Sequence, residues 1–221
     1  FRSEDWIKNG RQGAFEVNNF TSPAFIARVN YHGVKGLRVG ASFYYNQTAK
    51  NGTKPWRNTG YKFPVTIVTG DLQYKGFNNN LIVRGNAVYG NLGASGALTT
   101  INNSSSAASG YPNTTVAQNA VSYGGEAGYN ISSFFNSKAP RIYPFIRYEY
   151  YNPMEKTEAN TGLLADKRFQ VSAVTAGLNY YALPNLVIKA DYTHRSIGGG
   201  KYNDENLVSV GIAYIGWFIK K

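Results

Sequence analysis

Hydrophobic and polar residues alternate with a period of two along most of this chain. In the segment LVIKADYTHR, one alternate set contains Leu186, Ile188, Ala190 and Tyr192, and the other contains Lys189, Asp191, Thr193 and Arg195. From residue 207 onward, large apolar residues alternate with small ones. Successive side chains of a β-strand point to opposite faces, so this period predicts strands with one apolar face and one face that is polar or small.

Nine segments of the chain have this alternation, and together they predict an all-β protein with nine long antiparallel strands. The predicted strands are 24–31, 37–46, 61–74, 80–93, 120–131, 141–152, 168–181, 186–195 and 207–218. Most are close to the roughly nine to eleven residues that a tilted strand needs to cross a bilayer. Two places break the rule: the first half of 61–74 is apolar on both faces, and Phe169 and Val171 interrupt the alternation of their segment.

The connections between these segments differ in length in a regular way. Short connections at 32–36, 75–79, 132–140 and 182–185 alternate with longer ones at 47–60, 94–119, 153–167 and 197–205, although 132–140 and 197–205 are similar in length. Short turns on one side and long loops on the other are typical of an outer-membrane β-barrel. The segment 94–119 is low in charge and is too long for a hairpin turn, so we expect a surface loop or a plug.

Aromatic residues of the apolar rows fall at two levels along the predicted strands. If the long loops lie outside the cell, the aromatics near the outer strand ends are Tyr45, Tyr89, Tyr123, Tyr150 and Tyr192. Those near the inner ends are Tyr31, Tyr74, Tyr129, Tyr180 and Phe218. A bilayer has two interfaces, and aromatic girdles are enriched at both, so the pattern predicts that these residues contact the lipid interface.

Composition is consistent with this prediction and narrows it. The 221 residues, 24.3 kDa, fit a single domain over residues 1–221, and the 15% aromatic content suits interfacial belts. The sequence has no run of eighteen apolar residues, so we expect any membrane crossing to be made by strands closed into a barrel. The absence of cysteine excludes disulfides and thiolate metal sites.

The formal charge of +11 would suggest a nucleic-acid partner in a soluble domain, but Lys and Arg are scattered and form no basic stripe. The charged residues of the polar rows are candidate pore-lining residues: Arg28, Arg38, Asp71, Arg84, Glu126, Arg147, Glu149, Lys189, Asp191 and Arg195. Basic residues are in the majority, which favours anions modestly. The other interpretation is that these charges pair across strands and keep the wall hydrated.

No combination of residues predicts catalysis or a cofactor. His32 and His194 have no second ligand or carboxylate at a suitable spacing, so neither indicates a metal site or a general base. The glycines at 198–200 are not followed by Lys-Ser/Thr and open no helix, so they predict a hairpin loop and not a phosphate-binding loop. The remaining alternative to a membrane barrel is a soluble β-sandwich, a carbohydrate-binding module that uses exposed Tyr and Trp.

Several segments resemble a known family. These are RIYPFIRYEYYNP, TAGLNYYALPNLVIKADYTHR, KYNDENLVSVGIAYIGWF, FTSPAFIARVNY and GLRVGASFYY. They resemble the outer-membrane porins of Bacteroidetes that are related to the phosphate-selective porin family. The resemblance implies a sixteen-stranded, trimeric diffusion pore in the outer membrane of a Gram-negative bacterium, of which this chain is the C-terminal nine strands. The family's phosphate sites depend on basic ladders and on an inward-folded loop from the N-terminal half, so selection of phosphate stays open.

The sequence therefore predicts a water-filled channel for small hydrophilic solutes and ions with a mild preference for anions. Bacterial single-chain barrels have even strand numbers and periplasmic termini, so nine strands predict that an earlier part of the protein precedes Phe1. The alternative is that residues 12–19 form a tenth strand that closes a small barrel.

Overall fold

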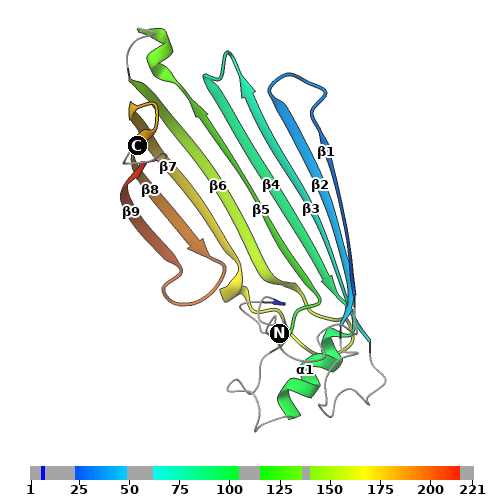
Figure 1. Cartoon of the computed structure of the whole chain (residues 1–221). Coiled ribbons are helices and arrows are strands. Elements are labelled where there is room, and N and C mark those ends of the chain that lie inside the picture. Colours follow the sequence, from blue (N-terminus) through cyan, green and yellow to red (C-terminus); the bar gives the residue numbers. More distant parts are fainter. Residues whose placement is uncertain (1–5, 8–22, 49–61, 105–114, 136–139, 215–221) are drawn as a thin grey trace, which may run out of the picture.

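The chain folds into one open antiparallel β-sheet. The computed structural model describes residues 6–7, 23–48, 62–104, 115–135 and 140–214. Its nine strands are β1 (Ala24–Tyr31), β2 (Leu37–Thr48), β3 (Phe63–Gly76), β4 (Leu81–Leu92), β5 (Asn119–Tyr129), β6 (Arg141–Lys156), β7 (Val171–Leu183), β8 (Leu186–Ile197) and β9 (Asp204–Tyr214). Each pairs with its neighbours in sequence, so the order is β1 to β9 with β1 and β9 at the edges (Figure 1). The predicted all-β class and nine antiparallel strands are confirmed.

Within the described residues, most strand boundaries differ from the predicted ones by one or two residues, and three differ by more. Residues 167–169 form a 3-10 turn, η4 (Lys167–Phe169), because Asp166 accepts a hydrogen bond from the Arg168 N–H, so β7 starts three residues later than predicted. β9 starts three residues earlier, since Ser196 already pairs with Asp204. β6 continues to Lys156, which pairs with Asn119 after a register shift in β5.

The predicted loop at 94–119 contains a helix, α1 (Ser95–Ser104). A second 3-10 helix, η3 (Ile131–Phe134), lies in the β5–β6 connection. An isolated helix as short as α1 is marginal in water, so its stability must come from its contacts. Leu98 supplies one of these, because its side chain is buried in a hydrophobic cluster at the end of the sheet.

The register places all apolar rows on one face of the sheet and the charged rows on the other. Phe43 lies opposite Val68, which lies opposite Tyr89. On the reverse side, Arg84 and Arg147 both lie opposite Glu126. We call these two sides the apolar face and the polar face. Side chains of β3 alternate between exposed positions such as Val68 on the apolar face and partly buried ones on the polar face, which indicates a sheet that curls towards its polar face.

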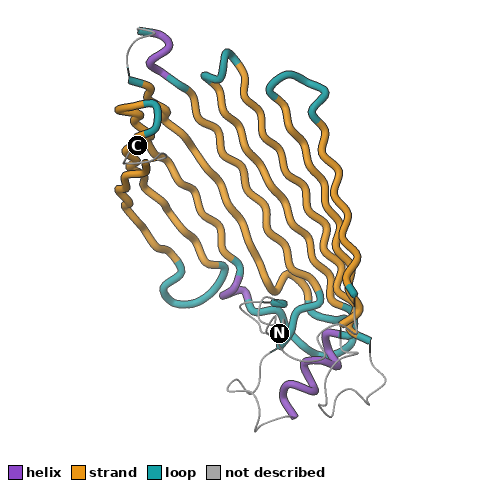
Figure 2. Tube along the Cα trace, viewed as in Figure 1, coloured by secondary structure: helices purple, strands orange, loops and turns teal. Residues whose placement is uncertain are grey.

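The apolar face is exposed across the whole width of the sheet. Its large exposed residues are Phe25, Val29, Tyr31, Val39, Phe43, Tyr45, Val68, Leu72, Tyr89, Tyr123, Ile146, Tyr148, Val174, Leu178, Tyr180, Ile188, Tyr192, Val208, Val210 and Ile212. Figure 2 shows the strands as a single layer, with the helices near its ends. In the described ranges, no second sheet packs on either face.

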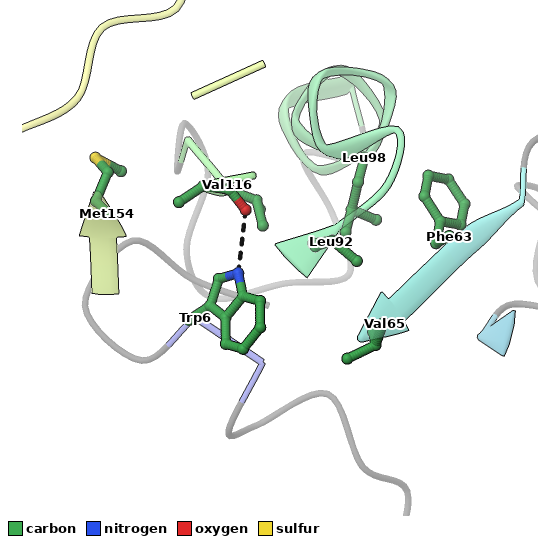
Figure 3. Packing of buried hydrophobic residues seen from close by; sticks show 8 residues of the cluster. Trp6, Phe63, Val65, Leu92, Leu98, Val116 and Met154 are labelled. Carbon is green, nitrogen blue, oxygen red and sulfur yellow. Dashed lines mark hydrogen bonds between the residues drawn. The ribbon is translucent and has the colours of Figure 1, made fainter. Parts of the chain in front are cut away.

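The buried core lies at one end of the polar face, next to the long connections. It contains Trp6, Phe63, Val65, Leu92, Leu98, Val116, Ala117 and Met154 (Figure 3). Phe63 and Val65 share their side of β3 with Asp71, so the polar face becomes apolar towards this end. This explains why the first half of the predicted strand 61–74 is apolar on both sides, and Phe169, which interrupts the alternation of its segment, also packs against this core. Val171, the other residue that breaks the alternation, is 3% exposed.

Within the described residues, no helix is long and apolar enough to cross a membrane. Residues 12–19, the predicted alternative tenth strand, lie outside the described residues.

Candidate functional site

The middle of the polar face is a groove built by five neighbouring strands, β2 to β6. It encloses about 440 Å³, and its polar lining residues are Arg38, Asp71, Gln73, Arg84, Asn86, Glu126, Arg147 and Glu149. The strand register explains this gathering, because Arg38, Gln73, Arg84, Glu126 and Arg147 lie directly opposite one another from strand to strand. Six of the ten predicted pore-lining residues therefore meet in one groove.

Glu126 is the centre of an ion-pair network in this groove. Its Oε2 accepts from Arg147, with Nη2 at 2.9 Å and Nε at 3.0 Å, and its Oε1 is 3.6 Å from Arg84 Nη1. Arg147 Nη1 is also 3.7 Å from Glu149. Two guanidinium groups thus share one carboxylate, while a second carboxylate lies at longer range. The Arg84 side chain, 59% exposed, is only weakly neutralised by the 3.6 Å contact.

A second pair spans three strands. Arg28 on β1 donates to Asp71 on β3 at 2.7 Å, and it also donates to Ser42 on the intervening strand β2 at 2.9 Å. The two partners meet above Gly40, where a Cβ would collide with both Arg28 Nη2 and Asp71 Oδ2. Because Gly40 has no side chain, the Arg28 side chain of β1 can pass over β2 and reach Asp71 on β3.

A third group lies near the long-connection end of β8. Arg195 donates to Glu205 on β9 at 2.6 Å and to the Tyr151 hydroxyl on β6 at 3.0 Å. In contrast, Arg38, Lys189 and Asp191 form no ion pair with any residue of the described part of the chain. Of the predicted lumen residues, Lys189, Asp191 and Arg195 lie on β8, outside the groove.

The pairing of charges across strands, one of the two interpretations of the sequence, is thus observed for six of the ten residues: Arg28, Asp71, Arg84, Glu126, Arg147 and Arg195. Glu149 pairs with Arg147 of its own strand. The face has further residues that sequence reasoning left out. Lys75 follows Gln73 at a spacing of two, Arg141 precedes Tyr143 in the same way, and Glu205 pairs with Arg195. Each lies an even number of positions from a polar-face residue of its own strand, and this spacing could have identified it from the sequence. Together they add two basic residues and one acidic residue to the polar face.

The predicted interface aromatics occupy the apolar face in two bands. Tyr31, Tyr74, Tyr129 and Tyr180 lie near the short-turn ends of their strands, and Tyr45, Tyr89, Tyr123, Tyr150 and Tyr192 lie towards the long-connection ends. Tyr123 and Tyr150 stack across β5 and β6 with ring centroids 4.9 Å apart. Phe218 lies outside the described residues. The contact of these rings with lipid remains a prediction.

The two histidines have no arrangement that indicates chemistry. His194 Nδ1 is 3.0 Å from the Asn206 side-chain oxygen, and its Nε2 is 3.4 Å from the Ser196 hydroxyl. Across the described ranges, no three His, Cys, Asp or Glu residues lie close enough together to hold a metal ion.

Comparison of the sequence with models of known protein families finds no match, and comparison with curated proteins finds none either.

Proposed function

We propose that this chain forms part of the wall of an outer-membrane porin, a water-filled channel for small hydrophilic solutes and ions with a mild preference for anions. The observation that carries the proposal is the exposed apolar face, which is continuous from β1 to β9 and lies opposite a face lined with paired charges. A transmembrane barrel has this division, with lipid on the outside of the sheet and water on the inside.

The size of the apolar face supports lipid, and not water, as its proposed environment. Nine strands spaced about 4.8 Å apart span roughly 38 Å, so an apolar band about 25 Å tall covers roughly 950 Å². Monomeric soluble proteins rarely expose contiguous apolar patches above about 300 to 600 Å². A soluble carbohydrate-binding sandwich would bury this face against a second sheet, and the described strands form only one sheet.

The strand directions restrict how such a sheet closes. With nine antiparallel strands in sequential order, β1 and β9 run in the same direction, so antiparallel closure requires an odd number of additional strands. A sixteen-stranded barrel, which the family resemblance implies, requires seven more, an odd number. We propose that the complete channel is such a barrel, and that it is a homotrimer in the outer membrane of a Gram-negative bacterium.

The charges that remain after pairing support the proposed mild preference for anions. Arg38 and Lys189 have no carboxylate partner among the described residues, and Arg84 shares Glu126 with Arg147. Asp191 is the only carboxylate of the predicted lumen set without an ion pair in the described ranges. Charged groups lining a pore set the field that a permeating ion meets, so an excess of cationic side chains favours anions.

The experiment is reconstitution of the full-length protein into planar lipid bilayers with a salt gradient across them. We expect stepwise conductance increases and a reversal potential on the side of anion permeation. Heat-denatured protein added at the same concentration is the control. A protein that stays monodisperse without detergent and produces no conductance would contradict the proposal and favour the soluble sandwich.

A further inference from the structure

The polar face is not open along its whole length, because its end next to the long connections is covered. Phe63 and Val65 of β3 and Leu92 of β4 point to this face and are 1%, 2% and 0% exposed. Helix α1 and residues 115–118, which follow it in the chain, supply the covering atoms through Leu98 and Val116. Figure 3 shows these side chains converging from the helix, the two strands and Trp6.

Trp6, which is far from α1 in sequence, packs into the same buried cluster. Its indole is 8% exposed, and its Nε1 donates to the backbone oxygen of Ala117 at 3.1 Å. The ring lies directly on Gly90 of β4, where a Cβ would collide with the far edge of the indole. A side chain at position 90 would therefore force the indole to shift.

Polar contacts hold α1 in a single orientation. The Thr99 hydroxyl donates to the Ser95 carbonyl at 2.9 Å and accepts from the Val116 N–H at 2.9 Å, which ties the helix to the segment returning to β5. The Glu158 carboxylate, from the loop after β6, accepts from the Gly96 N–H in the first turn of the helix at 2.5 Å. A carboxylate at a helix N-terminus is favoured by both the hydrogen bond and the helix dipole.

We infer that Trp6, α1 and residues 115–118, which we call the cap, form a constriction that sets the size limit of the channel. The inference rests on the proposed function. The cap covers the polar face of β3 and β4 with buried apolar side chains, on the same strands that line the charged groove. Close-packed apolar atoms leave no room for water or solute, so permeating molecules pass beside the cap and not through it. The charges that select ions and the atoms that limit size are thus separate.

Two variants of the full-length protein test this inference by different routes. Trp6→Ala removes the indole. Gly90→Ala keeps Trp6 but places a methyl group where its ring packs. We expect both to raise single-channel conductance in planar bilayers and to admit larger sugars in a liposome-swelling assay. We expect the reversal potential to be unchanged, since neither substitution alters a charge. Gly70→Ala is the matched control, because a Cβ at Gly70 meets no atom within 4 Å.

Tryptophan fluorescence, recorded in a background where every other tryptophan, Trp56 and Trp217 included, is replaced by Phe, reports whether Gly90→Ala has displaced Trp6. A red-shifted emission together with unchanged conductance and sugar cut-off would overturn the inference, because the cap would then be structural only. A wild-type protein without conductance would refute the proposed function and this inference together. A conducting wild type with unaltered variants would refute the cap alone.

Discussion

Arg28 on β1 and Asp71 on β3 form an ion pair of 2.7 Å although a whole strand, β2, lies between them. Neighbouring strands are about 4.8 Å apart, so the two backbones are separated by roughly 10 Å. A long guanidinium side chain covers this distance only because Gly40 offers no side chain in between. The pair therefore links three strands near the edge of the sheet.

Replacing Asp71 with Asn removes one carboxylate from the polar face and leaves Arg28 without its ion-pair partner. We expect the reversal potential to move further towards anion permeation. We expect the free energy of unfolding to change by no more than about 1 kcal/mol, because both side chains are partly exposed and such pairs contribute little. Asp204→Asn, the same charge change on the opposite side of the sheet, is the control. An equal shift in both variants would mean that Asp71 does not face the permeating ions.

Substitutions of Glu126 and Arg147 in the groove should shift the ion selectivity in opposite directions. Glu126→Gln leaves Arg84 and Arg147 without the carboxylate that they share, so anion preference should increase. Arg147→Gln leaves Glu126 with only the 3.6 Å contact to Arg84, so anion preference should decrease. The measurement is the reversal potential under one salt gradient. Shifts in the same direction, or no shift in either variant, would place the groove outside the ion path.

The strands could be predicted from the sequence because a period of two is a local signal. The alternation breaks down where contacts with distant parts of the chain determine whether a position is apolar. Phe63 and Val65 are apolar on the polar face because α1 covers them, and nothing in the strand itself indicates that cover. The helix was predicted as a loop for the same reason: its ten residues, SGALTTINNS, have little apolar periodicity and depend on Leu98 and on Glu158 of another loop.

The sequence predicts which charged residues share the polar face, but not which of them form ion pairs. Parity along each strand assigns Glu126 and Arg147 to the polar face, yet their pairing depends on the register between β5 and β6. The Arg28–Asp71 contact joins residues 43 positions apart and needs a glycine on the strand between them. The buried position of Trp6 gives no local signal in the sequence, because its partners Gly90 and Ala117 are far away along the chain.

A pH effect is expected in the loop that leads into β7. The Arg168 side chain donates to the Asp166 carboxylate, and the Arg168 N–H does the same, so the pKa of Asp166 lies below its ordinary value. A carboxyl with a lowered pKa stabilises the folded loop above the pKa of the unfolded chain, about 3.9, and this stabilisation is lost as pH falls through the lowered value. The Arg168 amide should therefore be less protected from hydrogen exchange at the acidic end of the pH range, after correction for the intrinsic exchange rate.

Asp166→Asn is the matched variant, because an Asn side chain still accepts a hydrogen bond from the Arg168 N–H but does not titrate. Protection of that amide should then vary less with pH than in the wild type. An identical pH dependence in the two proteins would assign the effect to another group.

The last prediction tests which face of the sheet meets lipid, using two adjacent residues of β9. Val210 is 76% exposed on the apolar face, whereas Ser209 lies opposite Asp191 on the polar face. In a bilayer, Val210→Arg should lower the free energy of unfolding by about 2 to 4 kcal/mol if the residue is near the midplane, because a charged side chain is then placed in hydrocarbon. Ser209→Arg should have little effect, since the new side chain lies in water beside a carboxylate. Urea unfolding in lipid vesicles measures both. Equal losses would reverse or abolish the assignment of the two faces, and a Val210→Arg variant as stable as the wild type would show that this face contacts water.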